Sequence, residues 1–297
     1  MELQTLHEQF CLESKVIRNC SKATIKWYEN AFKRYLKYHG NAMDNVADIN
    51  SENLRSFLFY GRLECDWTAD TFLNYYKGLK AFLKWCVKQG YFEVNPIEKI
   101  EKPRLEKKLP KRITKQDALL VLDHAFNGKW PYRFLRYRNR AVFGLMIYAG
   151  LRANELLSLK LGDVDLSNNI ISINCGKGGK DRVIPICSKL HVFIDAYLKD
   201  RSRLNKDSVY LFTSLQGDSK FTYDGLRKVV TEIKKRSGVK FSCHRLRHTF
   251  ATMMIEGGCD LFTLSKILGH SDIKTTTIYL SASVKHMQEQ IVKHPLN

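Results

Sequence analysis

Arg152 stands at a position where an arginine is costly unless its charge meets an anion. It follows the apolar stretch from Ala141 to Leu151, and a guanidinium beside a buried helix needs a negative partner. Glu155 lies three residues further on and can form an ion pair with it inside a helix. The sequence therefore leaves two interpretations of Arg152 equally open. One is a structural ion pair, and the other is a site for an external anion.

Lys177 lies in the turn GKGGKD, between two segments with the character of β-strands. Glycines allow the positive φ angles that tight hairpin turns require, so the lysine can simply belong to an exposed turn. The turn can also project a flexible ammonium group into a groove. The segment on its own does not decide between these two interpretations.

The segment SCHRLRHTF places His244 and Arg247 three residues apart, and therefore on one face of a helix, with His248 close to that face. A histidine on a helix is more often structural than catalytic, and the neighbouring arginine changes this only slightly. Zinc binding is an alternative, but the spacing of the available side chains matches no zinc motif. These side chains are Cys243, His244, Cys259 and His270.

His270 and Tyr279 complete the set of reactive side chains, in the segment ILGHSDIKTTTIYL. A Leu-Gly-His turn between two helices is common. A tyrosine within an apolar helix usually belongs to the core. Taken singly, both residues have ordinary structural explanations.

The order of these motifs is far more specific than any one of them. Along the chain they read R-x-x-E, G-K-G, H-x-x-R, L-G-H and T-T-x-x-Y. This set resembles the active site of the tyrosine recombinase (phage integrase) family, and the two-domain layout is most similar to its Xer-type members. The resemblance covers essentially the whole chain and is densest from Tyr148 to Tyr279. It implies six catalytic residues, namely Arg152, Lys177, His244, Arg247, His270 and Tyr279.

The resemblance also implies a role for each residue in cutting a DNA strand. Tyr279 would attack the phosphorus, forming a 3′-phosphotyrosyl link and expelling a 5′-hydroxyl group. Arg152 and Arg247 would hold the non-bridging oxygens, because a guanidinium binds two oxygens at once. Lys177 would protonate the leaving oxygen. His244 would accept and return the proton of the tyrosine.

Two further roles follow from the same resemblance. His270 would hydrogen-bond the phosphate, and Glu155 would orient the catalytic groups from behind. Two arginines and a lysine supply the positive charge, and the sequence has no cluster of carboxylates to hold a metal. No metal and no other cofactor is therefore expected.

The charge balance of the whole chain favours a nucleic-acid partner. There are 49 lysines and arginines against 30 aspartates and glutamates, a formal net charge of +19, and basic groups recur along the chain. Such a distribution suits a long polyanion that is contacted at many points. An anionic membrane is an alternative, but we find no basic amphipathic helix and no lipidation signal. A merely basic soluble protein is the other alternative.

The sequence also bears on location. The N-terminus lacks the apolar run of a signal peptide, and the longest apolar stretch is too short to span a bilayer. The eight cysteines include no C-x-x-C pair, which favours reduced thiols over disulfides or zinc. We expect a cytoplasmic, nucleoid-associated protein without a membrane partner.

The pattern of apolar residues predicts a mainly α fold with one small antiparallel β-sheet, in two domains. Residues 1–100 are predicted to be helical, with helices after Ser21, from Ser51 and from Ala69. By the resemblance this is a core-binding (SAM-like) domain that binds DNA. The resemblance implies that residues 113–297 form the catalytic domain, which is expected to carry the sheet, helices before and after it along the chain, and a C-terminal tail.

Residues 101–112 read as an interdomain linker, because prolines interrupt a charged stretch with little apolar periodicity. The linker is basic enough to lie along phosphates. The GKGGKD turn and the strand after it hold further basic residues for the same purpose. The predicted DNA contacts are Lys102, Arg104, Lys107, Lys108, Lys111, Arg112, Lys180 and Arg182.

The resemblance implies double-stranded DNA with paired inverted binding sites as the partner, and a homotetramer on two duplexes. Accessory proteins are possible. The tail from Ser281 carries a short apolar stripe, Met287, Ile291 and Val292, that can dock on its own domain or on a neighbouring subunit. Other classes that fit part of the pattern are a type IB topoisomerase, a catalytically silent DNA-binding protein and a metal-dependent nuclease.

Overall fold

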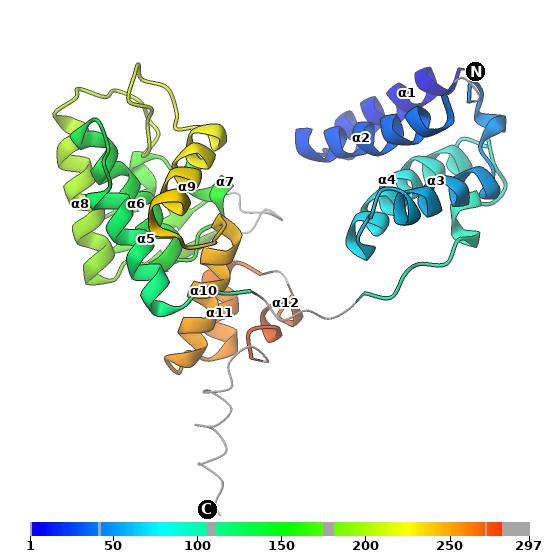
Figure 1. Cartoon of the computed structure of the whole chain (residues 1–297). Helices are drawn as coiled ribbons and strands as arrows, with labels where there is room; N and C mark the ends of the chain where they lie inside the picture. Colours follow the sequence, from blue (N-terminus) through cyan, green and yellow to red (C-terminus); the bar gives the residue numbers. More distant parts are fainter. Residues whose placement is uncertain (1, 41–42, 106–110, 175–180, 271, 281–297) are drawn as a thin grey trace, which may run out of the picture. The chain divides into compact units, whose positions relative to one another are not determined.

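The computed structural model describes residues 2–40, 43–105, 111–174, 181–270 and 272–280. The chain divides into two compact units, Met1–Lys107 and Lys108–Asn297. Secondary structure is mostly helical, with one three-stranded antiparallel sheet (Figure 1). The predicted fold class is therefore confirmed.

The first unit is built from helices alone in its described part. They are α1 (Leu3–Val16), α2 (Lys22–His39), α3 (Ser51–Leu63) and α4 (Ala69–Lys88), with short 3-10 turns η2 (Val46–Asp48) and η3 (Pro96–Lys99). Capping fixes several boundaries, since the Ser21 side chain accepts the backbone N–H of Thr24 and α2 ends at Gly40. The sequence predicts α2, α3 and α4 but misses α1.

Aromatic and aliphatic side chains from all four helices form the core of the first unit. Phe10 of α1, Tyr35 of α2, Phe57 of α3 and Phe82 of α4 are almost fully buried. Helix α1 buries one face along its whole length, from Leu3 to Ser14, and packs against α2 and α4.

Three helices of the second unit pack side by side (Figure 1). They are α5 (Lys115–Asn127), α6 (Arg133–Tyr148) and α8 (Ser188–Ser202), and α6 contacts both of the others. Helix α6 is the central one, because residues Ala141 to Ile147 are buried without interruption. The apolar stretch that the sequence shows before Arg152 is thus the buried helix of this unit.

The sheet lies between α7 (Ala153–Ser158) and α8 along the chain, after the 3-10 turn η4 (Leu161–Asp163). Its strands are β1 (Val164–Asp165), β2 (Ile170–Ile173) and β3 (Arg182–Pro185), in the order β1-β2-β3. Ile171 of β2 pairs with Val164 on one side and with Ile184 on the other. The predicted strands are confirmed, whereas the turn with Lys177 and Lys180 lies outside the described residues.

The remaining helices of the second unit are α9 (Tyr223–Ser237), α10 (Cys243–Glu256), α11 (Leu261–Leu268) and α12 (Lys274–Thr277). Helix α10 contacts both α6 and α11, and α11 also contacts β3 and α12. In this way four of the five motifs of the sequence come from elements that touch one another, and the fifth, G-K-G, lies outside the described residues.

Candidate active site

Arg152 and Glu155 are brought together by the turn from α6 into α7. Gly150 in this turn has a φ of +63°, and a Cβ built on it would come within 2.3 Å of the Phe250 ring. A glycine is therefore required at this position. Arg152 is the N-cap of α7, and its backbone N–H donates to Oε2 of Glu155 at 2.8 Å. The same carboxylate accepts a hydrogen bond from the Arg152 guanidinium at 2.7 Å.

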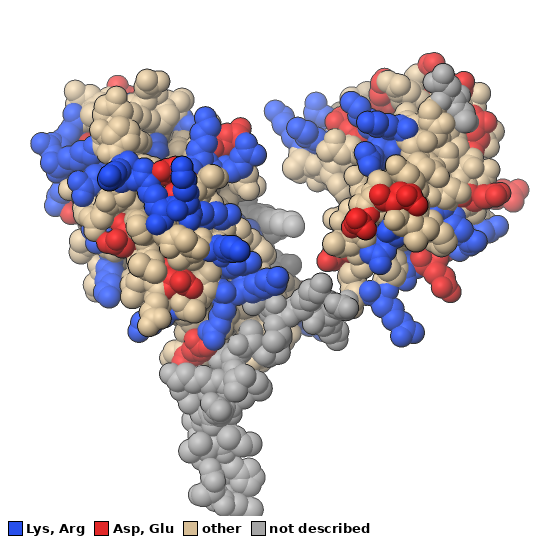
Figure 2. Space-filling model, viewed as in Figure 1, with Lys and Arg blue, Asp and Glu red and all other residues tan. Residues whose placement is uncertain are grey.

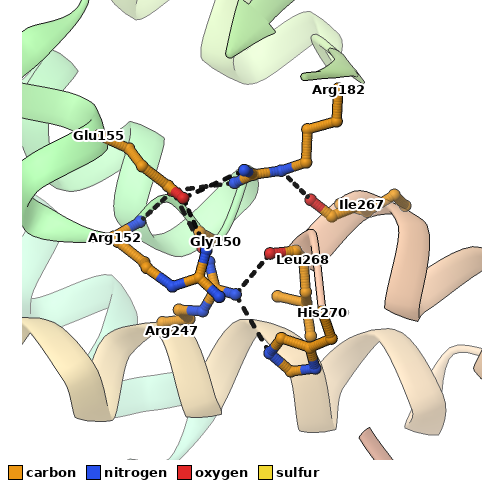
Figure 3. A network of polar contacts seen from close by, with 8 residues as sticks. All are labelled: Gly150, Arg152, Glu155, Arg182, Arg247, Ile267, Leu268 and His270. Atoms are coloured by element: carbon orange, nitrogen blue, oxygen red, sulfur yellow. Dashed lines mark hydrogen bonds and ion pairs between the residues drawn. The ribbon is translucent and has the colours of Figure 1, made fainter. Parts of the chain in front are cut away.

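Glu155 is buried and is held by a second arginine. The guanidinium of Arg182 in β3 donates to both carboxylate oxygens, at 3.1 and 2.9 Å, and to the carbonyl of Ile267 at 2.8 Å (Figure 3). Burial alone would raise the pKa of Glu155, but the hydrogen bonds from Arg182 and Arg152 outweigh it and lower the pKa to about 2. Glu155 is therefore ionised at neutral pH.

Arg247 is the most deeply buried cation of the group, with 3% of its side chain exposed. It donates to the carbonyl of Gly150 at 2.8 Å and to that of Leu268 at 2.6 Å, and it lies 3.8 Å from Glu155. Burial, followed by the positive charge of Arg152, lowers its pKa to about 10. The guanidinium nevertheless remains protonated at neutral pH.

His270 follows α11 and points toward Arg247 (Figure 3). Its Nε2 lies 3.2 Å from the guanidinium, and its Nδ1 lies 2.8 Å from the hydroxyl of Thr276. Because arginine can only donate, Nε2 is the acceptor and Nδ1 carries the proton that goes to Thr276. Burial, then Arg247 and Arg152, lowers the pKa of His270 to about 4, which agrees with a neutral ring.

Gly269, between Leu268 and His270, explains the L-G-H motif. Its φ is +63°, and a Cβ there would come within 2.9 Å of the Arg182 side chain. The glycine thus ends α11 in the left-handed conformation and leaves room for the arginine stem. As a result, the Leu268 carbonyl and the His270 ring both reach Arg247.

Positive charge exceeds negative charge in this network. Among the described residues, the guanidinium groups of Arg152, Arg182 and Arg247 share the single carboxylate of Glu155. Arg152 is the more exposed of the two predicted phosphate ligands, with 28% of its side chain accessible against 3% for Arg247. Such a cluster, open to solvent at one guanidinium, is suited to bind an anion with two or more oxygens.

Tyr279 follows α12 and is buried, with 2% of the residue exposed. Its ring lies in an apolar cluster with Phe250, Ile255, Leu264 and Leu268. Burial raises the pKa of the phenol, and the positive charges of Arg247 and Arg152 act in the opposite direction. Its hydroxyl is hydrogen-bonded to Nδ1 of His248, at 2.8 Å.

His244 lies one turn before His248 on α10 and is exposed. Its ring meets that of His248 edge-on, with the centroids 4.1 Å apart. Partial burial, followed by Arg247 and Arg152, lowers the pKa of His244. The contact with the tyrosine hydroxyl, which the sequence led us to expect from His244, is therefore made by His248 in this structure.

Comparisons with known proteins identify the family. The family model described as "Phage integrase family" matches residues 111–286, and that described as "Phage integrase, N-terminal SAM-like domain" matches residues 6–93. The chain belongs to the phage integrase family. More specifically, it is an Xer-type tyrosine recombinase, an enzyme that breaks and rejoins DNA strands.

Relatives of this integrase-family chain match it along most of its length. Tyrosine recombinase XerA of Thermococcus onnurineus is 32% identical over 272 residues, which cover 91% of this chain and 88% of the relative. Tyrosine recombinase XerC of Corynebacterium glutamicum is 29% identical over 296 residues, covering 99% and 93%.

Two solved structures share the fold. The post-cleavage complex of XerH site-specific recombinase bound to palindromic difH substrate has a TM-score of 0.74 and 24% identity, covering 96% of this chain and 83% of that one. The Tn1549 transposon integrase in complex with transposon right end DNA has a TM-score of 0.73 and 18% identity, covering 99% of both chains.

The structure places some predicted DNA contacts of this integrase-family chain differently from expectation. Arg182 turns its guanidinium inward onto Glu155, with 8% of its side chain exposed, which argues against a phosphate contact. Arg112 pairs with Glu256, and Lys102 lies 5.3 Å from the centre of the Tyr76 ring. Lys107, Lys108 and Lys180 fall outside the described residues. Arg104 and Lys111 are exposed.

A metal site and a membrane partner were two alternatives raised by the sequence, and the described residues bear on both. We find no group of three or more His, Cys, Asp or Glu side chains there that could hold a metal ion. In that same part of the integrase-family chain, none of the helices is both long and apolar enough to cross a membrane.

Sequence reasoning missed three contributors to the site: Arg182 as a partner of Glu155, Thr276 as a partner of His270, and His248 as a partner of Tyr279. The signal for His248 was available, since it directly follows Arg247 on the same helix. No signal pointed to Arg182, because its partners lie 27 and 85 residues away along the chain.

Proposed function

We propose that this recombinase cuts each strand by attack of the Tyr279 hydroxyl on a DNA phosphate held by Arg152 and Arg247. The observation that carries the proposal is the cluster of three guanidiniums around the Glu155 carboxylate. One of them, Arg247, directly precedes His248 on α10, and His248 is hydrogen-bonded to the Tyr279 hydroxyl. The excess positive charge matches the charge that develops on the phosphate oxygens during attack. The product is a 3′-phosphotyrosyl link that conserves the energy of the broken bond.

Glu155 and Arg182 act behind the phosphate ligands. The carboxylate holds the backbone and the guanidinium of Arg152, and Arg182 ties that carboxylate to the end of α11. Such a rigid network holds the hydrogen-bond donors in place before the substrate arrives. Electrostatic stabilisation of the transition state depends strongly on this preorganisation. His270 completes the phosphate site as a hydrogen-bonding residue, whereas His244, for which the resemblance implies proton transfer with the tyrosine, lies against the His248 ring.

His270 needs a different protonation state to act on a phosphate. Its Nε2 accepts from Arg247 in the free protein and therefore has no proton to give. Burial is the main cause of the low pKa of His270, and the charges of Arg247 and Arg152 add to it; an anionic phosphate near Arg247 would offset the contribution of the arginines and raise the pKa. Proton uptake by His270 on DNA binding follows from this proposal.

Lys177 is proposed as the acid that protonates the leaving 5′ oxygen. It lies outside the described residues, but the strands on both sides of its turn are described, and β3 carries Arg182. Arg182, the first residue of β3, binds Glu155. The position of Lys177 in the sequence, five residues before Arg182, supports a place near the phosphate.

Double-stranded DNA with paired inverted sites is the proposed substrate, bound by both units. In this proposal residues 1–100 form the core-binding domain, residues 101–112 a basic linker and residues 113–297 the catalytic domain. Figure 2 shows lysine and arginine side chains gathered on the visible face of the second unit. Helix α9 exposes Arg227, Lys228, Lys234 and Lys235, which suits contacts with phosphates.

The active assembly is proposed to be a homotetramer on two duplexes, joined through the tail from residue 281 and passing through a Holliday junction. Action on the chromosome would place the protein in the cytoplasm, on the nucleoid, and accessory proteins can set the direction of exchange. Dimer resolution, integration and transposition all remain compatible with this chemistry.

A supercoiled plasmid that carries either one or two candidate sites tests the proposal. Recombination requires two sites, so we expect a change of connectivity only with the two-site plasmid. Relaxation of both plasmids to the same extent, without exchange, would instead indicate a type IB topoisomerase. Tyr279→Phe should abolish both products.

A further inference from the structure

The nucleophile proposed above has one side chain on its reacting oxygen. The Tyr279 ring is buried among apolar side chains, and its hydroxyl lies 2.8 Å from Nδ1 of His248. His248 directly follows Arg247 on α10, so the partner of the nucleophile and the ligand of the phosphate share one rigid helix. The pair therefore fixes where the tyrosine oxygen lies relative to Arg247.

The direction of this hydrogen bond follows from the two protonation states. Burial, followed by the positive potential of His244 and Arg247, lowers the pKa of His248 to about 4, so the ring is neutral at pH 7. Burial raises the pKa of Tyr279, so the phenol keeps its proton. The phenol consequently donates and Nδ1 accepts, which leaves the proton of the imidazole on Nε2.

The other two histidines of the site are placed for different tasks. His270 is committed on both ring nitrogens, to Arg247 and to Thr276. His244 is exposed and touches the His248 ring rather than the tyrosine oxygen. Among the described residues of the site, His248 is thus the histidine whose acceptor nitrogen faces the atom that reacts.

We propose that His248 is a further catalytic residue, which holds the Tyr279 hydroxyl and takes its proton as the oxygen attacks the phosphorus. The bond from the tyrosine oxygen to phosphorus forms and the bond from phosphorus to the 5′ oxygen breaks. The tyrosine proton moves to Nδ1, and the 5′ oxygen receives a proton from Lys177. In rejoining, the 5′-hydroxyl attacks and His248 returns the proton to the tyrosine oxygen.

The arrival of DNA makes His248 a better base. In the free protein burial is the main reason why the imidazolium form is disfavoured, and the positive charge of Arg247 adds to it. A phosphate bound by Arg152 and Arg247 would offset that charge, and the pKa of His248 would rise toward its ordinary value. A base with a pKa nearer to neutrality takes a proton more readily in the transition state. Proton transfer is thereby coupled to the presence of the substrate.

The first test compares two substitutions of His248 on a nicked suicide substrate, by the rate at which the protein–DNA adduct forms. His248→Ala removes both the hydrogen bond and the base, and we expect a loss of roughly a hundredfold or more. In His248→Asn the side-chain oxygen can replace Nδ1 as acceptor but cannot take the proton. Its rate should lie between those of wild type and His248→Ala. Gel shift and thermal unfolding confirm that both variants fold and bind.

The second test asks which histidine receives the proton. Difluorotyrosine in place of Tyr279 has a more acidic phenol and needs a base less. This substitution should restore most of the rate of adduct formation that His248→Ala loses. It should not restore the rate that the control His244→Ala loses.

A wild-type rate in His248→Ala, or recovery of His244→Ala alone, would overturn the role given to His248. This inference rests on the proposed function, which fails separately if the wild-type protein forms no adduct at all.

Discussion

At the scale of single residues, the Glu155 carboxylate is the group on which the candidate site most depends. It binds two guanidiniums directly and lies 3.8 Å from a third. With 7% of its side chain exposed, it is too buried for water to replace those partners. Removing the carboxylate would leave Arg152, Arg182 and Arg247 facing one another without a counter-charge, which is costly in a buried place.

The lowered pKa of Glu155 predicts how this stabilisation depends on pH. A carboxylate whose pKa falls on folding stabilises the folded state above its unfolded pKa, and the effect is lost as the pH falls through the folded pKa. A fall from 4.5 to about 2 corresponds to roughly 3 kcal/mol. The difference in free energy of unfolding between wild type and Glu155→Gln should therefore be largest near neutral pH and shrink between about pH 4.5 and 2.

Urea unfolding at a series of pH values measures this difference. Glu232→Gln is the matched control, because Glu232 pairs with Arg236 on the outside of α9, where an ion pair contributes little. If the difference in free energy of unfolding between wild type and Glu155→Gln stays constant with pH, the folded protein does not stabilise the ionised carboxylate.

Lys177 gives a second prediction at this scale. If it protonates the leaving oxygen, a substrate with sulfur at the 5′ bridging position should not need it, because a thiolate leaves without a proton. Lys177→Ala should then cleave that substrate at close to the wild-type rate, while Arg152→Ala should remain defective on it. Cleavage of the two substrates is compared side by side. Equal defects of Lys177→Ala on both would assign the lysine to phosphate binding or to the turn alone.

At the scale of elements, two glycine turns bring the catalytic segments together. Gly150 follows α6, and its own carbonyl accepts a hydrogen bond from Arg247. Gly269 follows α11 and lies against the Arg182 side chain. Both have positive φ angles and neither has room for a Cβ. The glycines in the motifs are therefore part of how α6, α10, α11 and β3 assemble around one carboxylate.

We expect Gly150→Ala to destabilise the second unit by more than about 1 kcal/mol, because an alanine is strained in the left-handed region and its Cβ would overlap the Phe250 ring. Gly162→Ala is the matched control, since a Cβ there meets nothing within 4 Å and its φ is not positive. Thermal unfolding of the two variants makes the comparison. Similar melting temperatures would contradict the requirement for glycine at position 150.

Most elements could be predicted from the sequence, because caps and apolar periodicity are local signals. Ser21 caps the helix that was predicted to follow it, Gly40 ends that helix, and Thr114 caps α5 in the same local way. Residues 1–100 were predicted to be helical, but α1 was not placed, although its buried side chains recur at helical spacing from Leu3 to Ser14. Arg182 was predicted to bind DNA because it follows a basic turn, and only the fold brings it to Glu155 and Ile267.

At the scale of the whole molecule, the chain combines two compact units with a net charge of +19. We expect binding to DNA to be strongly salt-dependent, because each phosphate contact releases a counterion. The residues after Leu280 lie beyond the proposed nucleophile and cannot be needed to complete its motif. They are free to serve assembly instead.

Deletion of the chain from Met287 onward tests that role. If the tail docks on a neighbouring subunit, the truncated protein should bind a single half-site nearly as well as wild type but lose synapsis and strand exchange. Gel shift on one half-site and recombination on two full sites are measured together. Wild-type recombination by the truncated protein would exclude the tail as an assembly element.

The formation of a covalent protein–DNA adduct tests most directly whether Tyr279 is the nucleophile. Wild-type protein incubated with a nicked suicide site should form a protein–DNA adduct that resists SDS, and Tyr279→Phe should bind the same DNA without forming one. Tyr223→Phe is the control, because Tyr223 is an exposed tyrosine of the same unit and should leave the adduct unchanged. An adduct that persists in Tyr279→Phe and disappears in Tyr223→Phe would contradict the assignment.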